Sequence, residues 1–345
     1  MRHTVYFVVG FAVTAATYPY NVIKNPVAED GVSVVQQAMV TGKVADQQVR
    51  AYWTPERIAS IDHDPITSKP LEPIPVDDRH NGAEYEGGGA IPKTVGRLLY
   101  TIHLKNGTTL DNSCTATLLR SANRATAVTA GHCVKAGVDE YSKELGWHSN
   151  IFFIPGFRDG TGETNFTVNT AFISSLWDHG QLRERFSDDR AFMVLNPDPT
   201  WGKTAGELLG EGQHIKFEST QSHSTMRYNM GYPRYAEKGS KTPRYGSPAF
   251  TGLRLAACFG DPVDWWRFDA RLSGFSCLMG GGSSGGPHLA EFDLQRGIGT
   301  VVAVNSISDT PGQNSTQSYE YGAAVNDQFS KTLYEAAGAI HPRLH

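Results

Sequence analysis

The sequence predicts an all-β protein built from many short strands, of the sandwich or barrel type. Its 345 residues include 36 glycines, and 39% of them are hydrophobic against 19% charged, so a sizeable core can form. Helical periodicity is scarce, and short apolar runs alternate with turn residues at regular intervals. The exception is residues 325–337, whose pattern is helical.

The expected strands begin near residue 91. Residues 95–104 alternate loosely and lead into Asn106-Gly107, a strong hairpin signal. Further short runs rich in β-branched and aromatic residues predict strands at 114–119, 125–129, 152–155, 166–173, 191–195, 214–217, 226–231, 268–272, 299–304 and 318–323. Residue identities show no internal repeat.

The first residues have the pattern of a secretory signal. Arg2 and His3 precede an apolar run, and small residues at Val13 and Ala15 offer a cleavage site. The run is too short to span a bilayer, and no other stretch approaches about 18 to 20 apolar residues. We therefore expect a signal peptide over residues 1–16 and a secreted, extracellular protein with no membrane partner. An ordinary buried strand or helix is the alternative.

Residues 17–88 differ in composition from the rest. They hold 11 acidic and 6 basic residues and no cysteine, and four prolines between residues 65 and 75 precede the glycine run 87–89. Proline stiffens a chain and glycine loosens it, which is typical of linkers. We expect a propeptide and linker, and hence a zymogen, with Arg79 or the glycine run as the processing site. An N-terminal extension that is not removed is the alternative.

Charge and cysteine content narrow the function classes. The formal net charge of −4 does not suggest a nucleic-acid partner. Four cysteines, an even number after a secretory signal, predict two disulfide bonds. No pair has the CxxC spacing, so we expect no zinc site, and nothing in the sequence calls for a cofactor.

Two motifs carry residue types used in proton transfer. The run 129–133, Thr-Ala-Gly-His-Cys, places His132 on a loop beside a cysteine that can hold it. Histidine has the unperturbed pKa that suits proton transfer near neutrality. Asp188 and Asp189 then open a strand, where a carboxylate can orient an imidazole and stabilise its cation. Taken alone, a histidine is more often structural, and such an acidic pair is more often a solvated turn.

A third motif carries a candidate nucleophile. The run 280–287 reads Gly-Gly-Gly-Ser-Ser-Gly-Gly-Pro. Glycines allow backbone conformations closed to other residues, so successive N–H groups can converge on one point. A serine in such a turn, here Ser284, is exposed, with donors aimed at a developing oxyanion. A flexible loop is the alternative, and the closing Gly-Gly-Pro before an apolar strand argues against it.

In this order, the three motifs resemble those of the chymotrypsin-like serine peptidases, and the V8-like (glutamyl-endopeptidase-like) branch is the most similar. Shorter matches to that branch are 154–156 (Ile-Pro-Gly), 159–160 (Asp-Gly) and 231–233 (Gly-Tyr-Pro). The resemblance covers roughly residues 91–338. It implies two six-stranded antiparallel β-barrels with a short C-terminal helix, the first over residues 89–200 and the second over residues 201–345.

The resemblance implies a role for each motif. Ser284 matches the nucleophile, and His132 matches the general base and then general acid. The D-x-A register selects Asp189 over Asp188 as the orienting carboxylate. The backbone N–H groups of Gly282 and Ser284 match the oxyanion hole.

The resemblance also implies a disulfide pattern and one departure. Cys114 would pair with Cys133 and tie down the histidine loop, and Cys258 would pair with Cys277 before the nucleophile. Animal-type members carry an aspartate just before the nucleophile, which pairs with a newly freed N-terminus. Here that position is Ser283, so we do not expect that activation switch.

The implied substrate pocket is uncharged. Leu278 stands six residues before Ser284, where a carboxylate would select lysine or arginine side chains. Glutamate-specific members place a histidine where this chain has Asn305, next to Ser306. We expect an uncharged or small residue before the cleaved bond.

We therefore expect a secreted serine endopeptidase, a monomer that hydrolyses protein or peptide substrates through an acyl-enzyme on Ser284. One alternative is a catalytically inactive secreted binding protein on the same fold. Another is an α/β-hydrolase-type esterase, because residues 282–286 satisfy the G-x-S-x-G string. That fold requires the chain order serine, acid, histidine, which is reversed here.

Overall fold

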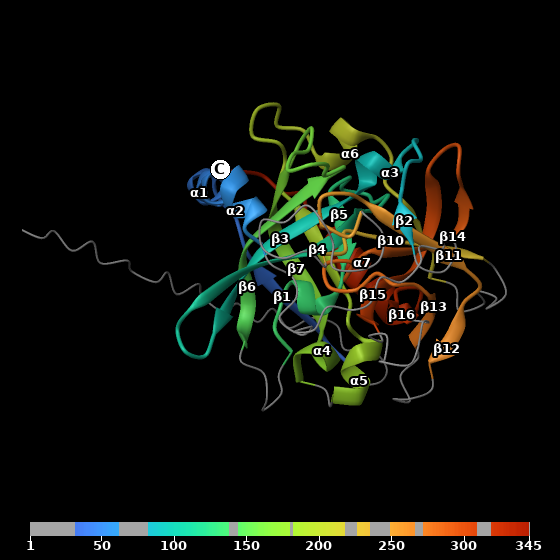
Figure 1. The fold of residues 1–345 in the computed structure, drawn as a ribbon. Coiled ribbons are helices and arrows are strands. Elements are labelled where there is room, and N and C mark those ends of the chain that lie inside the picture. Colours follow the sequence, from blue (N-terminus) through green and yellow to red (C-terminus); the bar gives the residue numbers. More distant parts are fainter. Residues whose placement is uncertain are drawn as a thin grey trace, which may run out of the picture.

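The computed structural model describes residues 32–61, 82–137, 144–179, 182–217, 226–234, 249–265, 272–308 and 319–344. The first of its two sheets contains β1 (Val34–Ala38), β3 (Val95–Leu104), β4 (Thr109–Leu118), β5 (Thr126–Thr129), β6 (Glu144–Pro155), β7 (Phe166–Ser174) and β8 (Ala191–Leu195). The strand order is β1-β7-β6-β3-β4-β5-β8, and β7 also pairs with β8. Six strands therefore close into an antiparallel barrel (Figure 1).

The second sheet contains β2 (Ala83–Glu84), β9 (His214–Ile215), β10 (Arg227–Gly231), β11 (Ala256–Gly260), β12 (Val263–Trp265), β13 (Leu272–Ser276), β14 (Pro287–Asp293), β15 (Ile298–Ser308) and β16 (Tyr319–Ala324). Its order is β12-β13-β16-β15-β14-β10-β11-β2, and β9 pairs with β15. A disulfide joins Cys258 of β11 to Cys277, which follows β13. In this order β13 and β11 are the first and last of six consecutive strands, so the disulfide links the two ends of that set.

The helices are short and lie around the sheets. They are α1 (Lys43–Tyr52), α2 (Pro55–Ala59), α3 (Ile91–Thr94), the 3₁₀ turn η1 (Gly131–Cys133), α4 (Ser175–His179), α5 (Leu182–Ser187), α6 (Ala205–Leu209) and α7 (Gln328–Gly338). None of the described helices is long and apolar enough to cross a membrane.

The C-terminal helix α7 returns to the first barrel. Asp327 caps its N-terminus by accepting from the Ser330 N–H. Leu333 is fully buried, and the helix packs on β7 and β8. The Asn123 side chain then donates to two carbonyls at the C-terminal end of the helix, at 2.9 and 2.8 Å. The helix therefore ties the end of the second half of the chain to the first half.

The fold class predicted from the sequence is confirmed. Strands β3 and β8 have the predicted limits, and α7 falls within two or three residues of its prediction. The strand expected at 268–272 lies almost wholly outside the described residues. The α/β-hydrolase alternative is wrong, because nearly all strand pairs are antiparallel and no parallel sheet with covering helices forms.

An N-terminal segment, residues 32–61, packs on the first barrel. β1 pairs antiparallel with residues 170–174 of β7, and α1 and α2 (blue in Figure 1) follow beside the barrel. Trp53 is buried and its Nε1 donates to the Asn150 carbonyl at 2.7 Å. Buried Asp46 accepts from Arg50 and from Thr167 of β7, at 2.7 and 2.6 Å.

This segment belongs to the stretch for which the sequence predicts a propeptide. Apolar side chains along it enter the main hydrophobic core: Val34, Val40, Val49, Trp53, Ile58 and Ile61. It therefore contributes to the fold, and its removal stays a prediction. The predicted signal peptide over residues 1–16 and the candidate processing site Arg79 lie outside the described residues.

Candidate active site

The histidine loop is built by the end of β5 and the turn η1. Gly131 begins the turn, and a Cβ there would lie 3.0 Å from the Trp177 ring and 3.2 Å from Asp189 Oδ1. The next residue is His132, whose backbone N–H donates to Asp189 Oδ1 at 2.8 Å. The disulfide Cys114–Cys133 ties the loop to β4, as the sequence analysis expected. Glycine therefore lets the loop approach the carboxylate closely.

His132 and Asp189 are in direct contact. His132 Nδ1 lies 2.7 Å from Asp189 Oδ2, and the Ser306 hydroxyl donates to the same oxygen at 2.6 Å. The Asp189 side chain is 1% exposed, whereas that of His132 is 32% exposed. The neighbouring Asp188 instead accepts from Arg190. The carboxylate thus fixes Nδ1 as the protonated ring nitrogen and leaves Nε2 free to act as a base.

The His132 ring is tuned by two opposing effects. Burial lowers the pKa of His132, and the charge and hydrogen bond of Asp189 raise it. The upward effect is larger, so the pKa of His132 lies above its ordinary value. The arrangement therefore stabilises the imidazolium that forms when the ring takes up a proton.

Further contacts hold the histidine loop from behind. Lys135 forms a buried ion pair with Asp178, and the Trp177 indole donates to the Lys135 carbonyl at 3.1 Å. Burial lowers the pKa of His148 to about 3, so this ring is neutral and its Nε2–H donates to the His132 carbonyl at 3.1 Å. The backbone on both sides of the imidazole is thereby fixed.

The serine loop, residues 280–286, has its peptide planes set by hydrogen bonds. The Gly281 carbonyl accepts from the Arg234 N–H, and the Ser283 carbonyl accepts from the Gly286 N–H, both at 2.8 Å. In a trans peptide the N–H points opposite to the C=O. These bonds therefore turn the N–H groups of Gly282 and Ser284 the other way, and neither donates to an acceptor among the described residues. Two unpartnered donors on one tight turn suit a developing oxyanion.

The serine loop lies against the histidine loop. The Ser284 carbonyl accepts from the Thr115 N–H at 2.8 Å. A Cβ on Gly285 would be 2.8 Å from the Ala130 nitrogen, two residues before His132. No hydrogen bond of the Ser284 hydroxyl to His132 occurs among the described contacts. Such bonds are often long without a substrate and tighten when one binds.

Solved structures with a similar fold include two bacterial or extremophile proteases. The chain is similar to the protease Anisep from Arthrobacter nicotinovorans, with 23% identity, a TM-score of 0.57 and coverage of 74% of this chain and 99% of that one. It is also similar to the thermostable serine protease AL20 from an extremophilic microorganism, with 24% identity, a TM-score of 0.56 and coverage of 72% and 98%. The fold is that of the chymotrypsin-like serine proteases. No protein-family model and no curated protein matches the chain.

The residues expected in the substrate pocket of this protease fold have different surroundings. Leu278 is buried beside the Cys258–Cys277 disulfide and Phe250. Asn305 is buried, with its side chain engaged by other polar groups. Ser306 turns its hydroxyl to Asp189, as described above. Ser306 therefore supports the carboxylate, and the place of these three residues in a substrate pocket stays a prediction.

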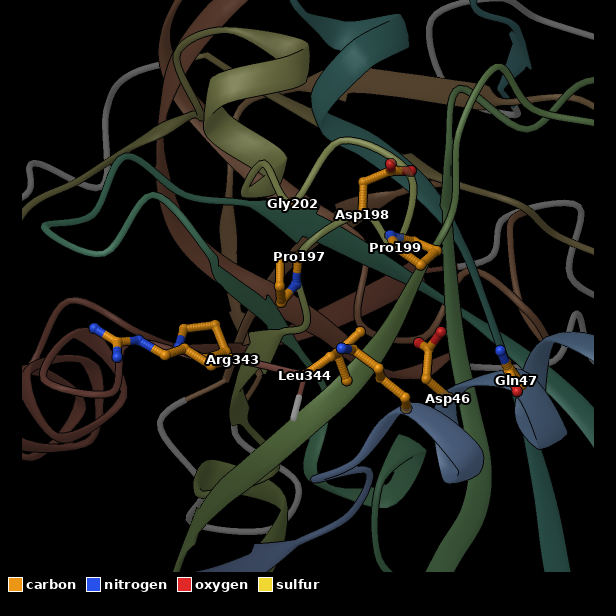
Figure 2. A pocket seen from close by; sticks show the side chains of 10 residues that line it. Asp46, Gln47, Pro197, Asp198, Pro199, Gly202, Arg343 and Leu344 are labelled. Carbon is orange, nitrogen blue, oxygen red and sulfur yellow. The ribbon is translucent and has the colours of Figure 1, made fainter.

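Two other features add no further candidate site residue. A pocket of about 360 Å³ lies between α1, the 197–202 loop and residues 342–344, and its lining includes none of the predicted site residues (Figure 2). The sulfur atoms of Cys114 and Cys133 come close to His132, but both belong to a disulfide and are not available as thiolate ligands.

Glu320 is a candidate site residue that the sequence analysis missed. It lies in β16, is 2% exposed and contacts the Ser283 hydroxyl directly beside the nucleophile. Its only sequence signal is a carboxylate in the middle of a predicted strand, between Tyr319 and Tyr321. Because side chains alternate between the two faces of a strand, the same pattern fits a carboxylate on the solvent face.

Proposed function

We propose that the protein is a secreted serine endopeptidase, in which Ser284, His132 and Asp189 form the catalytic triad. The observation that carries the proposal is the hydrogen bond from His132 Nδ1 to buried Asp189, with Ser306 bonded to the same carboxylate oxygen. The paired free N–H groups of Gly282 and Ser284 support it, as does a fold shared with serine proteases.

The reaction proceeds through an acyl-enzyme. Ser284 Oγ attacks the peptide carbonyl while His132 Nε2 takes its proton. The N–H groups of Gly282 and Ser284 stabilise the tetrahedral oxyanion, and loss of one such donor typically lowers kcat by about 10²- to 10³-fold. His132 then protonates the leaving amine, and a water molecule repeats the cycle to release the acid. The pKa of His132, raised by Asp189, suits this exchange of roles.

The substrate side chain before the cleaved bond is uncharged or small. Leu278 is apolar and buried where a basic side chain would need a carboxylate. Asn305 is neutral and occupied in a buried network, so it offers no cation to a glutamate. The chain therefore shares sequence motifs with the V8-like branch. The proposed specificity differs from the cleavage after glutamate that characterises the glutamate-specific members.

Secretion is part of the proposal. Both disulfides are formed in the structure, and such bonds persist in oxidising compartments. The apolar run before residue 16 suits export.

The substitution Ser284→Ala tests the nucleophile. We expect turnover of a peptide library to be abolished, with unchanged thermal unfolding, because only the attacking oxygen is removed. A serine-directed phosphonate should label the wild type, and it should not label the variant. Ser60→Ala, at a hydroxyl that bonds the backbone at the end of α2, is the matched control and should behave as wild type.

Each alternative predicts another result. An inactive binding protein would leave the wild type unlabelled and without turnover. Retained turnover in purified Ser284→Ala would contradict the nucleophile assignment. In the same library, equal cleavage after arginine and leucine would contradict the proposed specificity.

A further inference from the structure

A fully buried carboxyl group lies behind the serine loop. Glu320 Oε1 contacts the Ser283 hydroxyl, and Oε2 accepts from Asn229 Nδ2 at 2.9 Å. Cys277 Sγ, which belongs to a disulfide, lies 3.6 Å from Oε2. Glu320 forms no ion pair with any described residue. A carboxylate without a cation in such a place is strongly disfavoured.

The contacts of the Ser283 hydroxyl bear on the protonation of Glu320. The Ser283 hydroxyl is also 2.5 Å from the Gly280 carbonyl, which can only accept. A hydroxyl has one proton, so it cannot serve both this carbonyl and an ionised carboxylate. A neutral Glu320 resolves the conflict, because its O–H donates to Ser283 Oγ and the Ser283 O–H donates to Gly280. Burial acts in the same direction and raises the pKa of Glu320 to about 8.

A longer chain of buried hydrogen bonds leads to Glu320 with the same donor-to-acceptor direction. Burial lowers the pKa of His288 to about 3, so its ring is neutral and Nε2–H donates to Asn305 Oδ1 at 2.7 Å. Asn305 Nδ2 donates to Asn229 Oδ1 at 2.7 Å, and Asn229 Nδ2 donates to Glu320. With Glu320 neutral, each donor points to the next acceptor, in the order His288, Asn305, Asn229, Glu320, Ser283 and Gly280. We call these six residues the buried relay.

The buried relay fixes the peptide that carries an oxyanion donor. Asn305 Nδ2 also approaches the Ser283 carbonyl, at 3.2 Å, on the side where Gly286 N–H bonds it. At the other end, the Ser283 hydroxyl and its N–H both reach the Gly280 carbonyl. Ser283 is thus held by its side chain and by both of its backbone groups. Since its C=O is fixed, the Ser284 N–H in the same peptide plane is fixed too.

From this geometry we infer that neutral Glu320, acting through the Ser283 hydroxyl, is a positioning residue for the oxyanion hole. The inference rests on the proposed peptidase function. In the animal-type members of the family that the motifs resemble, the residue before the nucleophile is an aspartate held by a freed N-terminus. Here an internal carboxyl group holds a serine at that position, so the loop geometry needs no free N-terminus.

Groups that face Glu320 from the surrounding elements bear on its titration. The buried charged or titratable side chains among the described residues of β10, β14 and α5 are Arg227, His288 and Arg185. Arg227 donates to Ser273, His288 is neutral, and Arg185 lies over the Trp177 ring. None pairs with Glu320, so ionisation above pH 8 would place an uncompensated charge in the relay.

Three single variants and one double variant test the inference. Glu320→Ala and Ser283→Ala should each lower kcat by about 10- to 100-fold, with KM changed less than about twofold, because the oxyanion contact exists only in the transition state. Glu320→Gln should restore the kcat lost in Glu320→Ala, since a neutral amide donates to Ser283 and accepts from Asn229. The wild type should lose kcat above pH 8, and Glu320→Gln should not. The double variant Ser283→Ala/Glu320→Ala should be no worse than the poorer single variant.

Controls separate this inference from the peptidase proposal. Glu291→Gln, at an exposed carboxylate of β14, should match the wild type. Unchanged kcat in Glu320→Ala and Ser283→Ala, or additive losses in the double variant, would overturn the inference while leaving the peptidase intact. Infrared spectroscopy needs no activity: a carboxylic-acid band at pH 7 that disappears in Glu320→Gln supports a neutral Glu320, and its absence refutes one. A wild type that phosphonate does not label would refute the peptidase proposal instead.

Discussion

Replacing the buried acid Glu320 by glutamine should stabilise the protein near neutral pH. The carboxyl group loses its proton near pH 4.5 in the unfolded chain, whereas burial raises its pKa to about 8 in the fold. Between these values the unfolded state holds fewer protons, so its relative stability rises with pH and the free energy of unfolding falls. Each full pH unit in the window contributes about 1.4 kcal/mol, which gives about 3 kcal/mol at pH 7 and about 4 kcal/mol at pH 8, where half of the folded molecules have lost this proton.

Glutamine does not titrate, and it keeps the hydrogen bonds of the neutral acid. The difference in unfolding free energy between Glu320→Gln and wild type should therefore be near zero below pH 4.5, grow between pH 4.5 and pH 8, and level off above pH 8. Urea unfolding at half-unit pH steps measures it. Glu291→Gln is the matched control. Lys216 lowers the pKa of Glu291, so replacing this carboxylate by an amide should not raise the free energy of unfolding. Parallel pH curves for wild type and Glu320→Gln would refute the reasoning, since they require an ionised Glu320 in the fold.

Two further predictions concern the triad and the N-terminal segment. Asp189→Asn should lower kcat by about 10⁴-fold. It should also move the acid limb of the pH profile of kcat/KM to lower pH, because the group that raises the pKa of His132 is gone. An acid limb at the wild-type pH would contradict the assignment of Asp189. Trp53→Ala should lower the free energy of unfolding by about 3 to 5 kcal/mol in urea, whereas Trp201→Ala, at a side chain that is 70% exposed, should change it little; equal effects would show that residues 32–61 are not part of the folded unit.

Local sequence signals were sufficient for several of the strands and for two of the site loops, whereas β1, β2, β11 and β12 were not predicted. β3 and β8 could be delimited because apolar runs end at turn residues. The loops at His132 and Ser284 could be predicted because the glycines beside them allow tight turns, and because Cys133 can hold the histidine loop. For the carboxylate, the choice of Asp189 over Asp188 came from a short register, and the structure places Asp189 against His132.

Residues whose role depends on distant partners could not be predicted. Ser306 is 117 positions from Asp189 and Glu320 is 37 from Ser283, and neither has a local signal for its contact. The N-terminal segment was harder still. Its core residues are spread among charged ones, so the composition resembles a linker, although Trp53 and Ile61 are buried. The burial of this segment depends on packing against distant parts of the chain, which composition does not reveal.

The position of β1 has a consequence for how copies of this protein meet. Residues 170–173 of β7 pair with β8 along one edge and with β1 along the other. A chain without β1 would present an open row of backbone N–H and C=O groups on that edge, a ready template for a strand from another molecule. Residues 34–38 therefore guard the barrel against edge-to-edge association. Any maturation that released these residues would leave this edge of β7 exposed and prone to β-aggregation.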